Sequence, residues 1–105
     1  MSIEQIASLL KQIIVFELKF KQDILAKATN LGEQKLSELQ TILLEVKEWQ
    51  EQTLHKILVQ DPDFYDKILD AKRKTEREII NLYKQKLETE DHKKMEIILD
   101  KIKSL

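Results

Sequence analysis

The sequence predicts an all-α protein, an antiparallel up-down helical bundle, and three observations carry this prediction. The 105 residues include one glycine and one proline, whereas a β-rich or α/β fold of this length needs several turn glycines. Leu, Ile, Lys, Glu and Gln dominate, and all of these except Ile are strong helix formers. The apolar fraction of 42% and the well-mixed charges suit a single folded domain over residues 1–105.

Two turn signals divide most of the chain into segments of nearly equal length. Gly32 stands where a helix would end in a left-handed cap, and Asp61, Pro62 and Asp63 have the composition of a helix start. We therefore expect three long helices over residues 3–30, 33–60 and 62–88, each about 27 residues and ~40 Å long. Equal lengths with short connections predict an up-down-up arrangement.

The last boundary leaves two alternatives. Residues 88–94 contain no apolar side chain, and the apolar pattern resumes with Met95, Ile98, Ile102 and Leu105. Either the third helix continues to the C-terminus, or a separate short helix covers about residues 92–104. We favour the separate helix, because a continuous one would extend about four turns beyond its neighbours.

Residues 13–20, here called the apolar band, form the most apolar segment of the chain. Six of the eight residues are large and apolar, and on a helix their side chains would point in all directions. One neighbouring helix cannot bury all of them. We therefore expect Val15 and Phe16 to be at least partly exposed, and the C-terminal helix to be the segment that could fold back over the band.

The band is the predicted partner-binding surface. Its contact residues would be five side chains of the band with one nearby aromatic residue: Ile14, Val15, Phe16, Leu18, Phe20 and Trp49. The partner would be a protein, either an amphipathic client helix or a second copy of the chain that forms a homodimer. The alternative for the three aromatic residues is that they belong to an ordinary core.

Polar residues interrupt the apolar stripes of the three predicted helices at similar heights. Folding the helices antiparallel would bring these residues into one polar core layer: Glu17, Lys21, Gln50, Lys72 and Thr75. A buried polar layer fixes register and topology at some cost in stability. The alternative is that the stripes drift and these side chains extend into solvent.

The residues that usually carry catalysis are missing or isolated. The chain has no cysteine, its single glycine excludes a glycine-rich phosphate loop, and no Ser or Thr has a supporting His. Asp63, Asp66 and Asp70 share one helix face, and they are better explained as a complement to the helix dipole than as metal ligands. Glu48, Glu51 and His55 also share a face, but they lack the Glu-x-x-His spacing of di-iron bundles. We therefore expect no enzyme, cofactor or metal site, and a small metal-dependent helical enzyme is the remote alternative.

Charge and hydropathy narrow the partners further. The net charge is −1, from 18 basic and 19 acidic residues, which argues against nucleic acid as a partner. The longest uninterrupted apolar run has four residues, whereas a membrane span needs ~20. The N-terminus does not have the pattern of a signal peptide, and the absence of cysteine permits the cytosol. A cytoplasmic protein is the expectation.

These observations favour a non-catalytic helical interaction module, an adaptor or a chaperone-like protein. A homo-oligomeric structural bundle that uses the same band is the alternative. The expected layout resembles the small helical export chaperones of flagellar and type III secretion systems, which hold client helices against an apolar groove. This likeness concerns architecture and rests on no particular residues.

Overall fold

The computed structural model describes residues 3–72 and 76–105, with side chains for 3–70 and 77–105. Every regular element in these ranges is a helix, which confirms the all-α prediction. The six helices are α1 (Ile3–Gln12), α2 (Leu18–Ala28), α3 (Glu33–Gln60), α4 (Phe64–Lys72), α5 (Glu76–Lys86) and α6 (Thr89–Lys103). None of the described helices is long and apolar enough to cross a membrane.

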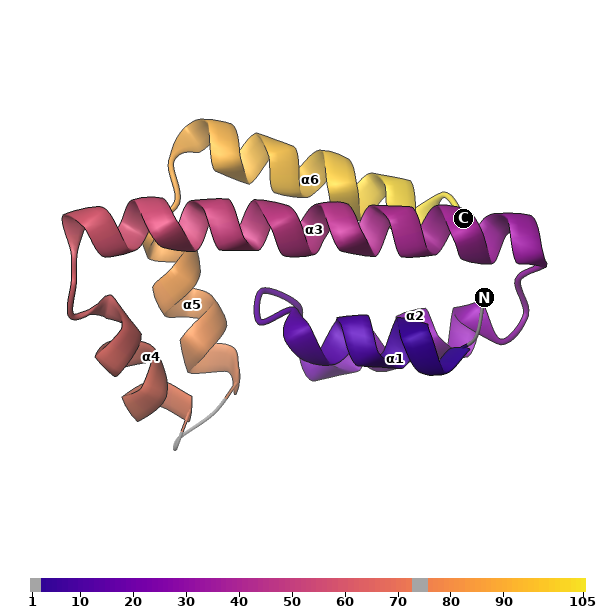
Figure 1. Ribbon diagram of the computed structural model, residues 1–105, viewed down its shortest axis with the longest axis horizontal. Helices are drawn as coiled ribbons and strands as arrows, with labels where there is room; N and C mark the ends of the chain where they lie inside the picture. The colour runs from indigo at the N-terminus through magenta and orange to yellow at the C-terminus, as the bar shows by residue number, and fades with distance from the viewer. Residues whose placement is uncertain (1–2, 73–75) are drawn as a thin grey trace.

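Helix α3 runs the whole length of the molecule, and the other helices pack around it (Figure 1). Its bounds are those predicted for the second helix. Gly32 precedes its first residue with φ −72° and ψ 167°, so the expected left-handed cap at Gly32 is wrong. The glycine is instead the N-cap of α3, a position that it accepts readily. The apolar stripe predicted for this helix faces the core: Leu36, Leu39, Leu43, Val46 and Ile57 are buried, and Leu58 is half-buried.

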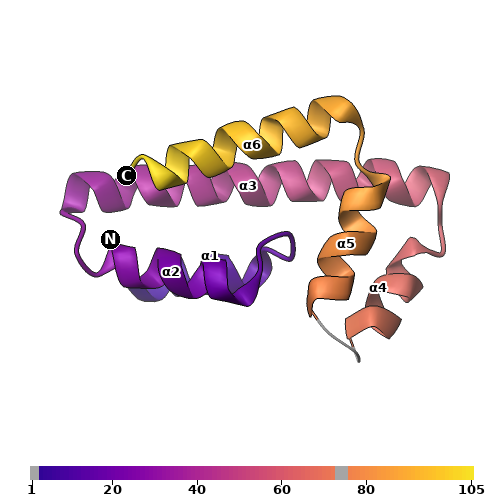
Figure 2. The ribbon, with the colours of Figure 1, turned by 180° about the vertical axis from the view of Figure 1, so that it is seen from behind.

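The predicted continuous helix over 3–30 is wrong, because the chain leaves the helix between Gln12 and Leu18 and turns back. Helices α1 and α2 form a hairpin beneath α3 (Figure 1). Helix α5 stands across the end of this hairpin (Figure 2), and Leu18 and Lys19 at the start of α2 line a hollow together with Arg77 and Ile80 of α5. A straight extension of α2 toward the N-terminus would meet α5, so the chain turns there.

The predicted helix over 62–88 is also wrong. Helices α4 and α5 form a second hairpin at the C-terminal end of α3, and residues 73–75 between them are outside the described ranges. Asp61 ties this hairpin to α3, since its carboxylate lies 2.9 Å from the ammonium of Lys67 and 3.3 Å from that of Lys86. The hydrogen bond from Lys67 lowers the pKa of Asp61. The three-long-helix bundle, on which the likeness to export chaperones rested, is therefore not the observed architecture.

Helix α6 is separate from α5, as we favoured, and runs antiparallel to α3 along its length (Figure 1). Asp91 in its first turn accepts a hydrogen bond from the Glu88 amide at 3.3 Å, which closes the N-terminus. At the other end, the ammonium of Lys27 in α2 donates to the carbonyls of Ile102 and Lys103 at 3.4 and 3.1 Å. Helix α6 therefore lies across both α3 and α2, with its apolar face in the core: Met95, Ile98 and Ile102.

Candidate functional site

The turn between α1 and α2 contains the centre of the apolar band and buries it. Val15 and Phe16 are 4% and 3% exposed, so the expected exposure of these two side chains is wrong. Because the chain leaves the helix at residue 13, side chains that would point outward on a continuous helix turn into the core. Ile14 and Phe20 are half-buried and Trp49 is buried, whereas Leu18 is 55% exposed.

Helix α6 lies over the band. The C-terminal helix is also the segment that we expected to fold back over it. Met95 and Leu99 of α6 face Val15, Phe16 and Phe20 across a cavity of about 220 Å³. The rings of Phe16 and Phe20 meet edge to face, with their centroids 4.9 Å apart. The band is thus an intramolecular contact surface, and α6 packs over it with a cavity between them.

Gln50 of α3 holds the turn by taking the place of missing helix hydrogen bonds. Its side-chain oxygen accepts from the Ile14 amide at 2.7 Å, and its side-chain nitrogen donates to the Gln12 carbonyl at 2.9 Å. In a continuous helix these two backbone groups would bond to residues four positions away. A buried amide side chain, 7% exposed, thus satisfies both sides of the break.

The predicted polar core layer does not form as expected. Glu17 is exposed and lies 4.0 Å from Arg77, because the turn places it at the surface as the N-cap of α2. Lys21 is half-buried. Gln50 is buried, and its side chain bonds to the backbone of the turn. The side chain of Lys72 and all of Thr75 lie outside the described residues.

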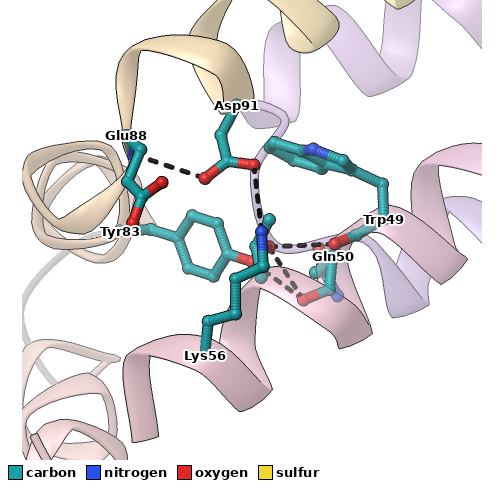
Figure 3. Close-up of polar contacts among 7 residues, drawn as sticks. Trp49, Gln50, Lys56, Tyr83, Glu88 and Asp91 are labelled. Carbon is teal, nitrogen blue, oxygen red and sulfur yellow. Dashed lines mark hydrogen bonds and ion pairs between the residues drawn. The ribbon is translucent and has the colours of Figure 1, made fainter. Parts of the chain in front are cut away.

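A different polar cluster joins α3 to α5 (Figure 3). The Tyr83 hydroxyl donates to the Gln50 carbonyl at 2.8 Å and also bonds the hydroxyl of Thr53. Burial raises the pKa of Tyr83 from its ordinary value of 10 to about 12, so the hydroxyl keeps its proton even in moderately alkaline solution. Sequence reasoning missed Thr53, although its spacing of three from Gln50 placed it on the same helix face.

A second concave surface lies between α3 and α6, here called the α3–α6 groove. It has a volume of about 780 Å³, is open to solvent, and is lined by Ser37, Glu38, Thr41, Ile42, Glu45, Ile97, Asp100, Lys101, Ser104 and Leu105. Ile42 and Leu105 are half-buried, and Ile97 is 57% exposed. The groove therefore presents apolar side chains to solvent along the seam of two antiparallel helices.

The lining of the groove is acidic. It carries three carboxylates, those of Glu38, Glu45 and Asp100, and one ammonium group, that of Lys101. Lys101 lies 3.6 Å from Glu45 and offsets its charge. Two carboxylates, those of Glu38 and Asp100, remain to attract a positively charged occupant.

No family model, curated protein or solved structure matches the chain. Within the described part of the chain, no three His, Cys, Asp or Glu residues are grouped closely enough to hold a metal ion. The candidate site therefore rests on the geometry of the α3–α6 groove.

Proposed function

We propose that the chain is a non-catalytic protein-interaction module that receives an amphipathic helix of a partner in the α3–α6 groove. The observation that carries the proposal is the exposure of Ile97 beside Ile42 and Leu105, along a groove between antiparallel helices. This moves the docking surface from the apolar band, which sequence reasoning favoured, to the opposite side of α6.

The spacing of the lining residues suits a helical occupant. Glu38, Ile42 and Glu45 follow each other at intervals of four and three along α3, and Ile97, Lys101 and Ser104 do the same along α6. Each set forms one straight wall, which is the arrangement that a helix lying between two helices requires. Ser37 and Thr41 occupy further lining positions on α3, and Ser104 ends the α6 set; all three are small hydroxyl residues that allow close approach.

The charge of the groove favours a partner helix with a basic polar face. Its apolar face would cover Ile97, Ile42 and Leu105, while lysine or arginine residues approach Glu38 and Asp100. Burial of a side chain such as that of Ile97 contributes roughly 1.5–3 kcal/mol. The charges add chiefly to the association rate and to specificity, and salt weakens them.

Selection of peptides against the full chain tests the proposal. A displayed library of amphipathic helices is panned against the protein, and the selected peptides are measured by fluorescence anisotropy with the natural chain, with Ile97→Gln and with Leu69→Gln. Leu69 is an exposed leucine on α4, away from the groove, and serves as the matched control. We expect basic peptides whose affinity falls about tenfold with Ile97→Gln, a loss of about 1.4 kcal/mol, and is unchanged with Leu69→Gln.

Equal binding of the selected peptides to both variants would place the docking surface elsewhere. Selection of acidic and basic peptides in equal numbers would contradict the role given to the carboxylates. A homodimer through the apolar band stays the second prediction; because Val15 and Phe16 are buried beneath α6, it would require α6 to move. Light scattering of the full chain measures it directly.

A further inference from the structure

The cavity between α2 and α6 lies on the side of α6 that faces away from the α3–α6 groove. Leu99 lines the cavity and Ile97 lines the groove, and two positions along a helix are about 200° apart. The apolar lining of the cavity consists of Val15, Phe16, Phe20, Met95 and Leu99. Nothing in the role proposed for the groove accounts for this space.

The mouth of the cavity is basic. Lys84 of α5 and Lys103 of α6 line the cavity and are exposed to solvent, and within the described part of the chain neither ammonium group has an ion-pair or hydrogen-bond partner. Glu17 also lines it, but Arg77 lies 4.0 Å from this carboxylate and offsets its charge. Two solvent-exposed positive charges thus line the same cavity as these apolar side chains.

We propose that this cavity binds a small amphipathic carboxylate, with its apolar tail among the side chains of Phe16, Phe20 and Met95 and its carboxylate beside Lys84 and Lys103. The size limits the tail. The cavity is open to solvent and has a volume of about 220 Å³. An enclosed apolar cavity of roughly 150 Å³ holds one benzene molecule, so on the same scale this space covers a tail of roughly eight or nine carbon atoms. A free medium-chain fatty acid fits both the volume and the charge.

Three probes with the same eight-carbon skeleton separate the contribution of the head group from that of the tail. Octanoate, octanol and octylammonium are titrated into the full chain by calorimetry at pH 7. Octanoate should bind most tightly and octylammonium at least tenfold more weakly, with octanol between them. Since only the folded protein has the cavity, octanoate should also raise Tm.

Variants at the mouth test the two lysines. Lys84→Met with Lys103→Met removes both charges but keeps much of the apolar length of each side chain. Octanoate affinity should fall about tenfold, equal to about 1.4 kcal/mol, while octanol affinity stays unchanged. The control is Lys93→Met with Lys94→Met, which changes the net charge equally at exposed positions of α6 outside the cavity.

Three results would overturn this proposal: no octanoate binding at 10 mM, equal affinities for octanoate and octylammonium, or an equal loss from both double variants. Ile97→Gln should leave octanoate binding intact, because it alters only the groove. The experiments therefore test the fatty-acid site and the helix-binding groove independently of each other.

Discussion

Two segments of nearly equal length adopt different structures in this molecule. Residues 33–60 form one straight helix, whereas residues 3–28 form two helices joined by a turn. Neither segment contains a glycine or proline, so local sequence permits a continuous helix in both. The difference comes from tertiary contacts, since Gln50 bonds the backbone of the turn and α5 stands where α2 would extend.

The largest effect should follow the loss of Phe16. A continuous helix would leave this ring partly exposed, whereas the turn buries it to 3% exposure. We expect Phe16→Ala to lower the free energy of unfolding by about 3–5 kcal/mol. Urea denaturation measures this change, with Leu18→Ala as an exposed control from the same segment. A loss below about 1 kcal/mol would favour an exposed band, because surface substitutions usually have small effects.

A smaller loss should follow Gln50→Leu. The substitution keeps the burial of an apolar stem but leaves the Ile14 amide and the Gln12 carbonyl without their partner. Unpaired buried backbone groups cost roughly 1–3 kcal/mol each, and partial hydration at this surface-proximal turn should keep the total to about 2–4 kcal/mol. The exposed Gln52→Leu on the same helix is the control. If both variants unfold at the same urea concentration, Gln50 does not hold the turn.

The smallest change in the free energy of unfolding should come from Leu18→Pro, although proline is the residue that most disturbs a helix. Leu18 is the first residue of α2, its side chain is exposed, and Glu17 before it has φ −65° and ψ 151°. Proline suits the first helical position, and an extended residue suits the place before it. We expect a change within about 0.5 kcal/mol, or a slight gain.

The matched control for this proline is Leu44→Pro, at a leucine of similar exposure in the middle of α3. It should cost about 3 kcal/mol or more, because proline inside a helix removes a hydrogen bond and clashes with the preceding turn. Similar losses for both prolines would mean that residues 3–28 are one continuous helix in solution.

The bounds of α3 could be predicted because its signals are local: a regular apolar stripe between Gly32 and Asp61. The break in residues 3–28 has no local turn signal, and its only trace in the sequence is an apolar band too crowded for one helix face. The misplaced Glu17 follows from the same error, because its predicted burial assumed an unbroken helical register.

The α3–α6 groove is harder to predict from the sequence than the break in residues 3–28. Ile97 was visible as an apolar residue beside the main stripe, but its exposure depends on where α6 settles on α3. That placement is fixed by contacts distant in sequence, such as those of Lys27 with the carbonyls of Ile102 and Lys103. Contacts between residues about 75 positions apart produce no periodic pattern in the sequence from which the packing of α6 could be predicted.

Trp49 gives the molecule a built-in optical probe. It is the only tryptophan of the chain, it is 3% exposed, and its ring centroid lies 6.3 Å from that of Tyr83 in α5. Its indole nitrogen has no hydrogen-bond partner among the described residues, so its emission should lie at short wavelength in the native state. A red shift would report water entering between α3 and α5, without any attached label.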